Sequence, residues 1–153
     1  MYEEILVPTD GSEGSKRAVE EAAELAAAFD AVLHVLYVVE TRALPMDVDT
    51  GEILTELEAE GKQAIDEVVE TADAAGVSTT EAVVGRGTPH RAILDYSDQH
   101  DVDLVVMGTH GRTGLNRFLL GSVTEKVVRA SDVPVLTVRT SGEEAADAGA
   151  NGE

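Results

Sequence analysis

The stretch AVLHVLYVV, from Ala31 to Val39, decides the fold class. It is a near-continuous apolar run that is rich in valine. A strand with one face in water alternates apolar and polar residues, whereas a strand of a parallel sheet is covered on both faces and is apolar throughout. The run therefore predicts a buried strand of a parallel sheet, and His34 within it is expected to be packed.

Helical and extended patterns alternate on both sides of this run. Apolar residues recur at helical spacing in four stretches, and short valine-rich runs separate them. We predict helices over residues 15–29, 54–75, 88–100 and 122–131, and the other strands over residues 4–8, 77–85, 102–107 and 133–139. Residues 41–51 are predicted as a loop. Gly76 is expected to end the second helix, and Thr88 is expected to be the N-cap of the third, with Pro89 at its first position.

The order βαβαβαβαβ predicts a doubly wound, five-stranded parallel sheet with helices on both faces. We expect one domain over residues 1–140 and a disordered acidic tail over residues 141–153. In such sheets ligands bind outside the carboxyl ends of the strands, where the strand order reverses. The candidate site is therefore built from the segments that follow the first four strands, among them PTDGS, GRGTPH and GTHGRTG.

The composition argues against several classes of partner. The chain has 153 residues and carries 30 Asp and Glu against 11 Lys and Arg, which gives a net charge of −19. Such a surface repels phosphate backbones, so we expect no nucleic-acid partner. No apolar run approaches the roughly 20 residues of a membrane helix, and the acidic start MYEEILVP is not expected to be a signal peptide. The lack of cysteine excludes disulfides and thiolate sites and fits a cytoplasmic protein.

The scarcity of lysine beside arginine and acidic residues also predicts the kind of organism from which the protein comes. Only three lysines stand beside eight arginines, within a large acidic excess. This pattern favours a halophilic source, whose salt screens the self-repulsion of the surface. An ordinary acidic protein from a low-salt cytoplasm is the alternative.

The segment GTHGRTGLNRFLLGS, residues 108–122, offers two elements that suit an anion. Gly108 and Gly111 follow the fourth strand, where glycine lets backbone N–H groups turn toward a ligand. Gly121 and Ser122 open the last helix, whose first N–H groups and partial positive charge suit a phosphate. The apolar FLL between them is expected to anchor the connector to the core. The alternative is a flexible loop followed by an ordinary N-cap.

Charge supports the anion site. Residues 108–129 have a net charge of +3 in a chain that is acidic elsewhere, from Arg112, Arg117, Lys126 and Arg129 against Glu125. Arg86 and Arg91 lie near the neighbouring loop. A basic region around one crevice attracts anions, although some of these arginines could instead pair with surface acids.

Asp10 and His110 are the candidate polar residues of the crevice. Asp10 could bind a ribose hydroxyl or a Mg²⁺ ion bridging phosphates, or could be only a turn residue. His110 could donate to a phosphate or act in acid–base chemistry, or have no role. A catalytic triad of Asp10, His110 and Ser122 is disfavoured because Ser122 is expected to be an N-cap whose hydroxyl also meets a phosphate.

The chain resembles the universal stress protein family over residues 1–140. The resemblance rests on ILVPTDGS and on VVMGTHGRTGLNRFLLGSVTEKVVRASDVPVLTVR, with the spacing Gly108-x2-Gly111-x9-Gly121-Ser122 that marks the ATP-binding branch. It implies a sheet of strand order 3-2-1-4-5, the Rossmann-like architecture of the adenine nucleotide alpha hydrolases. It also implies a homodimer joined through the strand from Val133 to Arg139.

The resemblance further implies ATP at the carboxyl ends of the first and fourth strands, with ADP or AMP not distinguished. Asp10 could help to hold Mg²⁺ or Mn²⁺. The nucleotide-binding residues implied are Pro8, Thr9, Asp10, Val35, Met107, Gly108, His110, Gly111, Arg112, Gly121, Ser122, Val123 and Thr124.

Three functions remain open on the sequence. The favoured one is a cytoplasmic, homodimeric ATP-binding stress protein that acts as a nucleotide-dependent switch or reservoir. The second is a slow ATPase or nucleotide phosphohydrolase assisted by His110 or Asp10. The third is a dimerisation module that binds no nucleotide.

Overall fold

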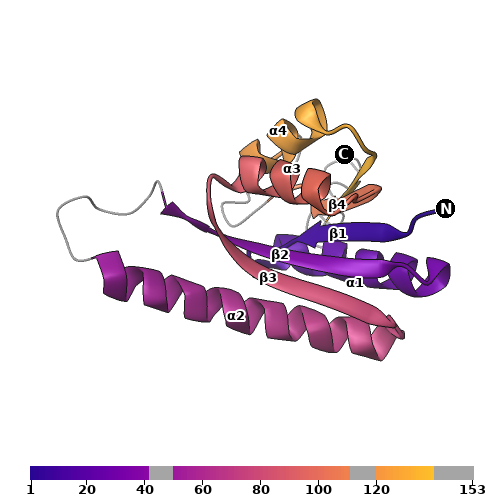
Figure 1. Cartoon of the computed structure of the whole chain (residues 1–153), viewed down its shortest axis with the longest axis horizontal. Helices are drawn as coiled ribbons and strands as arrows, with labels where there is room; N and C mark the ends of the chain where they lie inside the picture. Colours follow the sequence, from indigo (N-terminus) through magenta and orange to yellow (C-terminus); the bar gives the residue numbers. More distant parts are fainter. Residues whose placement is uncertain (42–49, 111–119, 140–153) are drawn as a thin grey trace, which may run out of the picture.

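The structure is a computed structural model that describes residues 1–41, 50–110 and 120–139. Five strands alternate with four helices along the chain (Figure 1). Their bounds are β1 (Glu4–Pro8), α1 (Glu13–Phe29), β2 (Val32–Glu40), α2 (Thr50–Ala75), β3 (Thr79–Gly87), α3 (Pro89–Gln99), β4 (Leu104–Gly108), α4 (Ser122–Ala130) and β5 (Val135–Val138). The tail expected over residues 141–153, and most of the loop expected over residues 41–51, lie outside the described residues.

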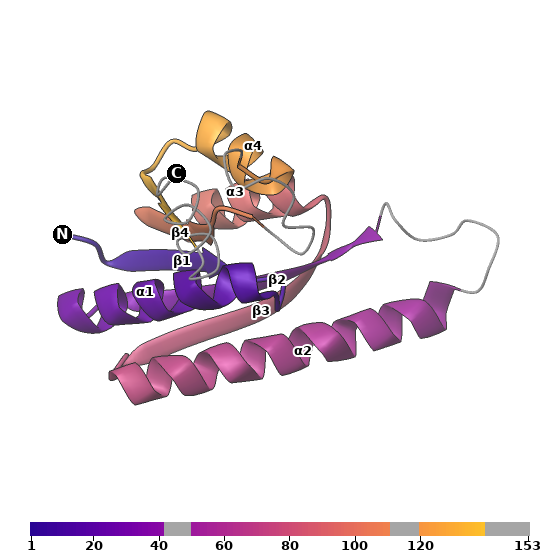
Figure 2. The ribbon, with the colours of Figure 1, turned by 180° about the vertical axis from the view of Figure 1, so that it is seen from behind.

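All neighbouring strands are parallel, and their order is β3-β2-β1-β4-β5. The order reverses between β1 and β4, which are hydrogen-bonded neighbours in the middle of the sheet. Helices α1 and α2 cover one face and α3 and α4 the other, as the views from the front and from behind show (Figures 1 and 2). The predicted fold class and strand order are therefore confirmed.

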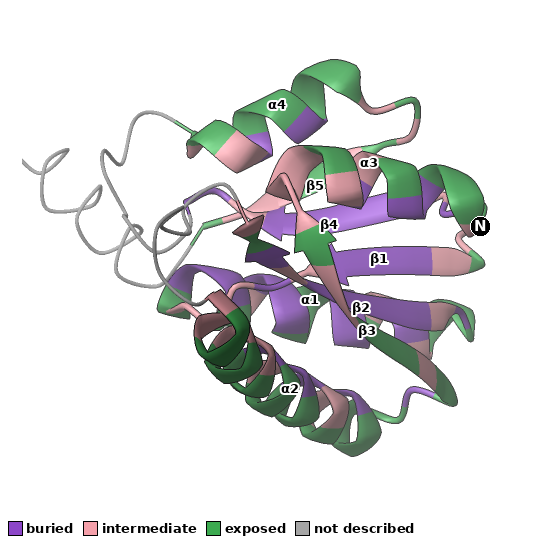
Figure 3. Ribbon diagram, turned by 60° about the vertical axis from the view of Figure 1, so that its left-hand side comes forward, coloured by how far each residue is buried: buried purple, intermediate pink, exposed green. Residues whose placement is uncertain are grey.

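The central strands are apolar on both faces, which is why they form the core (Figure 3). Ile5 and Val7 of β1 belong to the cluster under α1 and α2, whereas Leu6 between them belongs to the cluster under α3 and α4. The same alternation continues through β2, where His34 is only 3% exposed, so it is packed as predicted. Edge strand β3 has far fewer buried residues.

Most predicted boundaries are correct to within two residues, and the start of α2 differs most. Helix α2 begins at Thr50, four residues earlier than predicted. Strand β3 begins at Thr79 because Val77 belongs to the end of α2: its N–H donates to the Ala72 carbonyl around Gly76, whose φ is +90°. This is the usual glycine-containing end of a helix.

In the described part of the chain, no helix combines the length and apolarity needed to cross a membrane.

Candidate functional site

The turn after β1 forms one wall of the candidate site. The Thr9 N–H donates to the Leu36 carbonyl at 2.9 Å, which holds the turn to the neighbouring strand β2. One carboxylate oxygen of Asp10 accepts from the Ser12 N–H at 2.9 Å, and Gly11 between them has a φ of +78°. Asp10 therefore has the role of a turn residue, and its role toward a ribose or a metal stays a prediction.

The end of β4 forms the opposite wall and holds the start of α4. The Gly121 N–H donates to the Thr109 carbonyl at 2.7 Å. The Thr124 hydroxyl donates to the Gly108 carbonyl at 2.9 Å. Thr109 in turn donates its N–H to Val138 of β5 at 3.1 Å. Through these bonds, two segments more than ten residues apart in sequence are held together at the point where the strand order reverses.

The N-cap of α4 differs from the prediction. Gly121 occupies the N-cap position with φ −62° and ψ 155°, and Ser122 is the first helical residue, so the assignment of Ser122 as N-cap is wrong. Glycine and serine are both acceptable N-caps, which is why the sequence placed the N-cap one residue late. The first N–H groups of a helix have no acceptor within it, so the backbone of residues 122–124 suits an anion.

Gly14 is a residue of this region that the sequence analysis did not single out. It lies in the first turn of α1, where a Cβ would collide with the His110 carbonyl. A Cβ on Gly108 would in turn collide with the Gly14 carbonyl. The N-terminus of α1 therefore touches the backbone at the end of β4. A glycine in the first turn of a helix, where alanine is preferred, was the available signal.

The remaining predicted residues lie at different depths in the fold. Pro8 ends β1 and is adjacent to the turn, and His110 follows Thr109 with 7% exposure. Val35 is fully buried and pairs with both Val7 and Ala82, next to Leu36, whose carbonyl accepts from Thr9, and the contact of its backbone with an adenine stays a prediction. Met107 is buried in the cluster under α3 and α4. Gly111 and Arg112 lie outside the described residues.

Two expectations about residues 108–129 and the neighbouring loop are tested in part. Leu120 is 38% exposed, so it does not anchor the connector in the core, and the preceding Phe and Leu lie outside the described residues. Arg129 pairs with Glu125 at 3.0 Å, and Arg86 pairs with Glu58 at 2.7 Å. For Arg129 and Arg86 the alternative interpretation, pairing with surface acids, is therefore confirmed.

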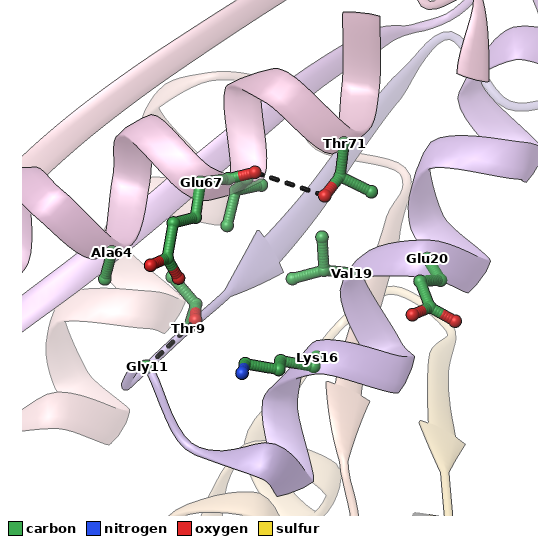
Figure 4. A pocket seen from close by; sticks show the side chains of 9 residues that line it. Thr9, Gly11, Lys16, Val19, Glu20, Ala64, Glu67 and Thr71 are labelled. Atoms are coloured by element: carbon green, nitrogen blue, oxygen red, sulfur yellow. Dashed lines mark hydrogen bonds between the residues drawn. The ribbon is translucent and has the colours of Figure 1, made fainter. Parts of the chain in front are cut away.

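A pocket of about 120 Å³ lies next to the β1–α1 turn, between α1 and α2 (Figure 4). Thr9 and Gly11 line it together with residues of the two helices. Lys16 is also at its edge, and its contact with Glu13 raises the pKa of the lysine, which keeps the ammonium charged. None of the described residues of α4 lines this pocket, so it is separate from the segment expected to hold phosphates.

The described residues fit a phosphate better than a protein-bound metal. The buried Ser12 hydroxyl, next to the start of α1, makes no hydrogen bond within the described residues, so it is available to a phosphate oxygen. Within residues 1–41, 50–110 and 120–139, no three His, Asp or Glu side chains gather in a metal-binding group. A Mg²⁺ or Mn²⁺ ion would therefore take its ligands mainly from phosphate oxygens and water, with Asp10 as the protein ligand.

The fold defines a doubly wound α/β protein, the class in which ligands bind outside the carboxyl ends of the strands where their order reverses, here between β1 and β4. The profile of the universal stress protein family matches residues 1–139, so the chain belongs to that family. It is 38% identical over 143 residues to universal stress protein MJ0531 of Methanocaldococcus jannaschii, an alignment that covers 91% of this chain and 83% of that one.

Solved structures of relatives share the fold. The hypothetical protein MJ0577 superposes with a TM-score of 0.82 at 31% identity, over 91% of this chain and 96% of its own. A universal stress protein in complex with cAMP superposes with a TM-score of 0.71 at 32% identity, over 92% of this chain and 98% of its own. That relative carries an adenine nucleotide.

Proposed function

We propose that this chain binds an adenine nucleotide at the carboxyl ends of β1 and β4, and that it works as a homodimeric, nucleotide-dependent switch in the stress response. The main support for the proposal is that hydrogen bonds from Gly121 to Thr109 and from Thr124 to Gly108 fix the α4 N-terminus next to the end of β4. A helix N-terminus presents N–H groups and partial positive charge to a phosphate. The relative solved with cAMP supports the adenine class.

ATP is the nucleotide we expect, with ADP and AMP as the alternatives. The N–H groups of Ser122, Val123 and Thr124 would receive the phosphates, together with Gly111 and Arg112. A Mg²⁺ or Mn²⁺ ion would neutralise part of the phosphate charge when bound. We expect the nucleotide to be held rather than rapidly hydrolysed, with Asp10 and His110 as the candidates to assist a slow hydrolysis.

The dimer would form through β5, the edge strand next to β4. Edge strands expose unpaired backbone groups, and covering them avoids uncontrolled association. Leu136 on β5 and Val128 on α4 are 38% and 42% exposed, which gives this edge an apolar surface suited to a second copy. We also expect the protein to work in the cytoplasm and, given its net charge of −19, at high salt.

The test starts with protein purified without added nucleotide. Denaturing it and analysing the released small molecules should yield an adenine nucleotide, and calorimetry at high salt should detect ATP binding. Gly121→Val should abolish binding, because a β-branched side chain would stand at the α4 N-terminus. The absence of both released nucleotide and measurable ATP binding would reject the proposal in favour of a nucleotide-free module.

A further inference from the structure

A buried histidine lies among four titratable side chains on the face of the sheet that α3 covers. His34 of β2 is only 3% exposed. Its Nε2 is 2.8 Å from a carboxylate oxygen of Glu4 on β1, and its Nδ1 is 2.7 Å from the Tyr96 hydroxyl on α3. Glu81 on β3 lies 3.5 Å from the same Nδ1. The candidate nucleotide site, at the opposite ends of the strands, uses none of these groups.

The arrangement follows from the register of the parallel strands. His34 is paired with Glu81 of β3, and the Glu4 side chain lies one pleat away on β1, on the same face. Helix α3 closes the cluster from above, with the rings of Tyr96 and His100 stacked at 3.8 Å. His100 is the remaining titratable group near His34, at 5.6 Å between ring centroids.

The Glu4 carboxylate and the Tyr96 hydroxyl together decide which nitrogen of a neutral His34 carries the proton. Burial, and then the charges of Glu81 and Glu4, raise the pKa of Tyr96, so its phenol keeps its proton. Neutral imidazole has one donor nitrogen and one acceptor. A Glu4 carboxylate can only accept, so Nε2–H donates to Glu4 and Nδ1 accepts from Tyr96. Every polar atom of the neutral ring is then satisfied.

A proton added to His34 breaks this pattern. Both ring nitrogens of an imidazolium are donors, so Nδ1–H then needs an acceptor: the Tyr96 hydroxyl accepts only if it turns its own proton away, whereas the Glu81 carboxylate accepts without rearranging a proton. A carboxylate is also the stronger acceptor for a charged donor, and the Glu81 side chain, 3.5 Å away, is 55% exposed.

We propose that His34 is a proton-dependent latch: when it takes up a proton, the hydrogen bond of Nδ1 passes from the Tyr96 hydroxyl of α3 to the Glu81 carboxylate of β3. The new hydrogen bond to Glu81 then binds edge strand β3 more firmly to β2, whereas α3 loses the hydrogen bond of Tyr96 to the sheet. The two elements follow each other in the chain, from Gly87 to Pro89, so the latch acts on one continuous segment. It does not depend on nucleotide binding.

The test is an NMR titration of the ¹⁵N-labelled full chain from about pH 5 to pH 8, the range in which histidine usually titrates. We expect His34 to be in the Nε2–H form when neutral, and the amide signals of both Glu81 and Tyr96 to shift in step with its protonation. A neutral His34 in the Nδ1–H form would overturn the proposal, as would a ring that does not titrate in this range.

The variant Glu81→Gln distinguishes the proposed transfer of the hydrogen bond from the titration of a buried histidine that does not act on β3. In this variant the pH-dependent shift at β3 should fall by at least half, whereas Asp98→Asn, which removes an exposed carboxylate from α3, should leave it unchanged. An unchanged β3 response in Glu81→Gln would refute the latch. His34→Gln should remove the response altogether, and Glu81→Gln decides the matter if that core variant does not fold.

Discussion

The carbonyl group of Gly14 occupies the place where a Cβ on Gly108 would lie. Helix α1 and strand β4 therefore meet through backbone alone at the carboxyl edge of the sheet, and the His110 carbonyl makes the reciprocal contact with Gly14. This contact joins the β1–α1 turn to the β4–α4 connection. Those are the two parts of the candidate site, so their spacing depends on two glycines that no single stretch of sequence reveals together.

Gly14→Ala should lower both stability and nucleotide affinity. Alanine is favoured over glycine in a helix by about 1 kcal/mol, so any loss must come from pushing α1 away from β4. We expect a lower melting temperature and at least about a tenfold weaker affinity for ATP, measured by thermal unfolding and calorimetry. Gly85→Ala is the matched control, because its Cβ would meet only Leu36 at 3.6 Å. A Gly14→Ala variant with unchanged melting temperature and affinity would contradict the argument.

A second glycine contact holds α2 against the same face of the sheet that α1 covers. A Cβ on Gly61 of α2 would lie 2.6 Å from the Tyr37 ring of β2. Gly61→Ala should therefore destabilise the fold by about 1–3 kcal/mol, as overpacking usually does, in spite of the gain in helix propensity. Urea unfolding measures the change. Adding Tyr37→Leu should recover part of the loss, and a Gly61→Ala variant more stable than the native chain would refute the contact.

The fold could be predicted from the sequence because each helix and strand has its own local pattern of apolar residues. Residues 31–39 are apolar without alternation, which indicates a strand covered on both faces. The boundaries were harder to place, since Val77 is apolar enough to look like strand, whereas its N–H caps α2. The strand order came from the resemblance to a family, because periodicity alone does not state which strands are neighbours.

The candidate site was predictable in outline only. The glycines after β4 and before α4 indicated an anion site, and the structure brings Gly121 to the Thr109 carbonyl. Contacts between distant residues could not be predicted, such as Gly14 with His110, or His34 with Tyr96 at 2.7 Å across 62 positions. Such pairs depend on helix packing, which a single sequence does not encode as a pattern.

The two edges of the sheet allow a matched test of the proposed dimer. Leu136 on β5 is 38% exposed and Val83 on β3 is 41% exposed, so the two positions are similar except for the edge on which they lie. Leu136→Glu should convert a dimer to a monomer in sedimentation or light scattering at high salt, because it buries a charge at the interface. Val83→Glu should remain dimeric. The reverse outcome would place the interface on β3.

Tyr96 is expected to lower the free energy of unfolding at alkaline pH. Burial first, then Glu81 and Glu4, raise the pKa of its phenol above the usual value of about 10. Below that usual value both the folded and the unfolded chain keep the proton, so the full stability is present. It is lost as the pH rises through the raised pKa of the folded protein, because the unfolded chain gives up its proton first.

Tyr96→Phe should therefore flatten the alkaline loss of stability, which urea midpoints at pH 9 and pH 11 measure. At neutral pH the same variant should cost about 1 kcal/mol, since it removes the hydrogen bond to His34. Tyr2→Phe is the control and should keep the alkaline loss, because Tyr96 is still present. An equal loss in Tyr96→Phe would mean that another group governs the alkaline range.

Thr124 joins the start of α4 to the end of β4 through a side chain that is 4% exposed, and its hydroxyl donates to the Gly108 carbonyl. Thr124→Val keeps the shape of the side chain but leaves that carbonyl without its donor, which should cost about 1–3 kcal/mol in urea unfolding. Because the bond also seats the α4 N-terminus, affinity for ATP should fall as well. Thr124→Ser retains the hydroxyl and loses one methyl group, about 0.8 kcal/mol, and should retain the affinity. Equal affinities for the Val and Ser variants would mean that the position of α4 does not depend on this hydrogen bond.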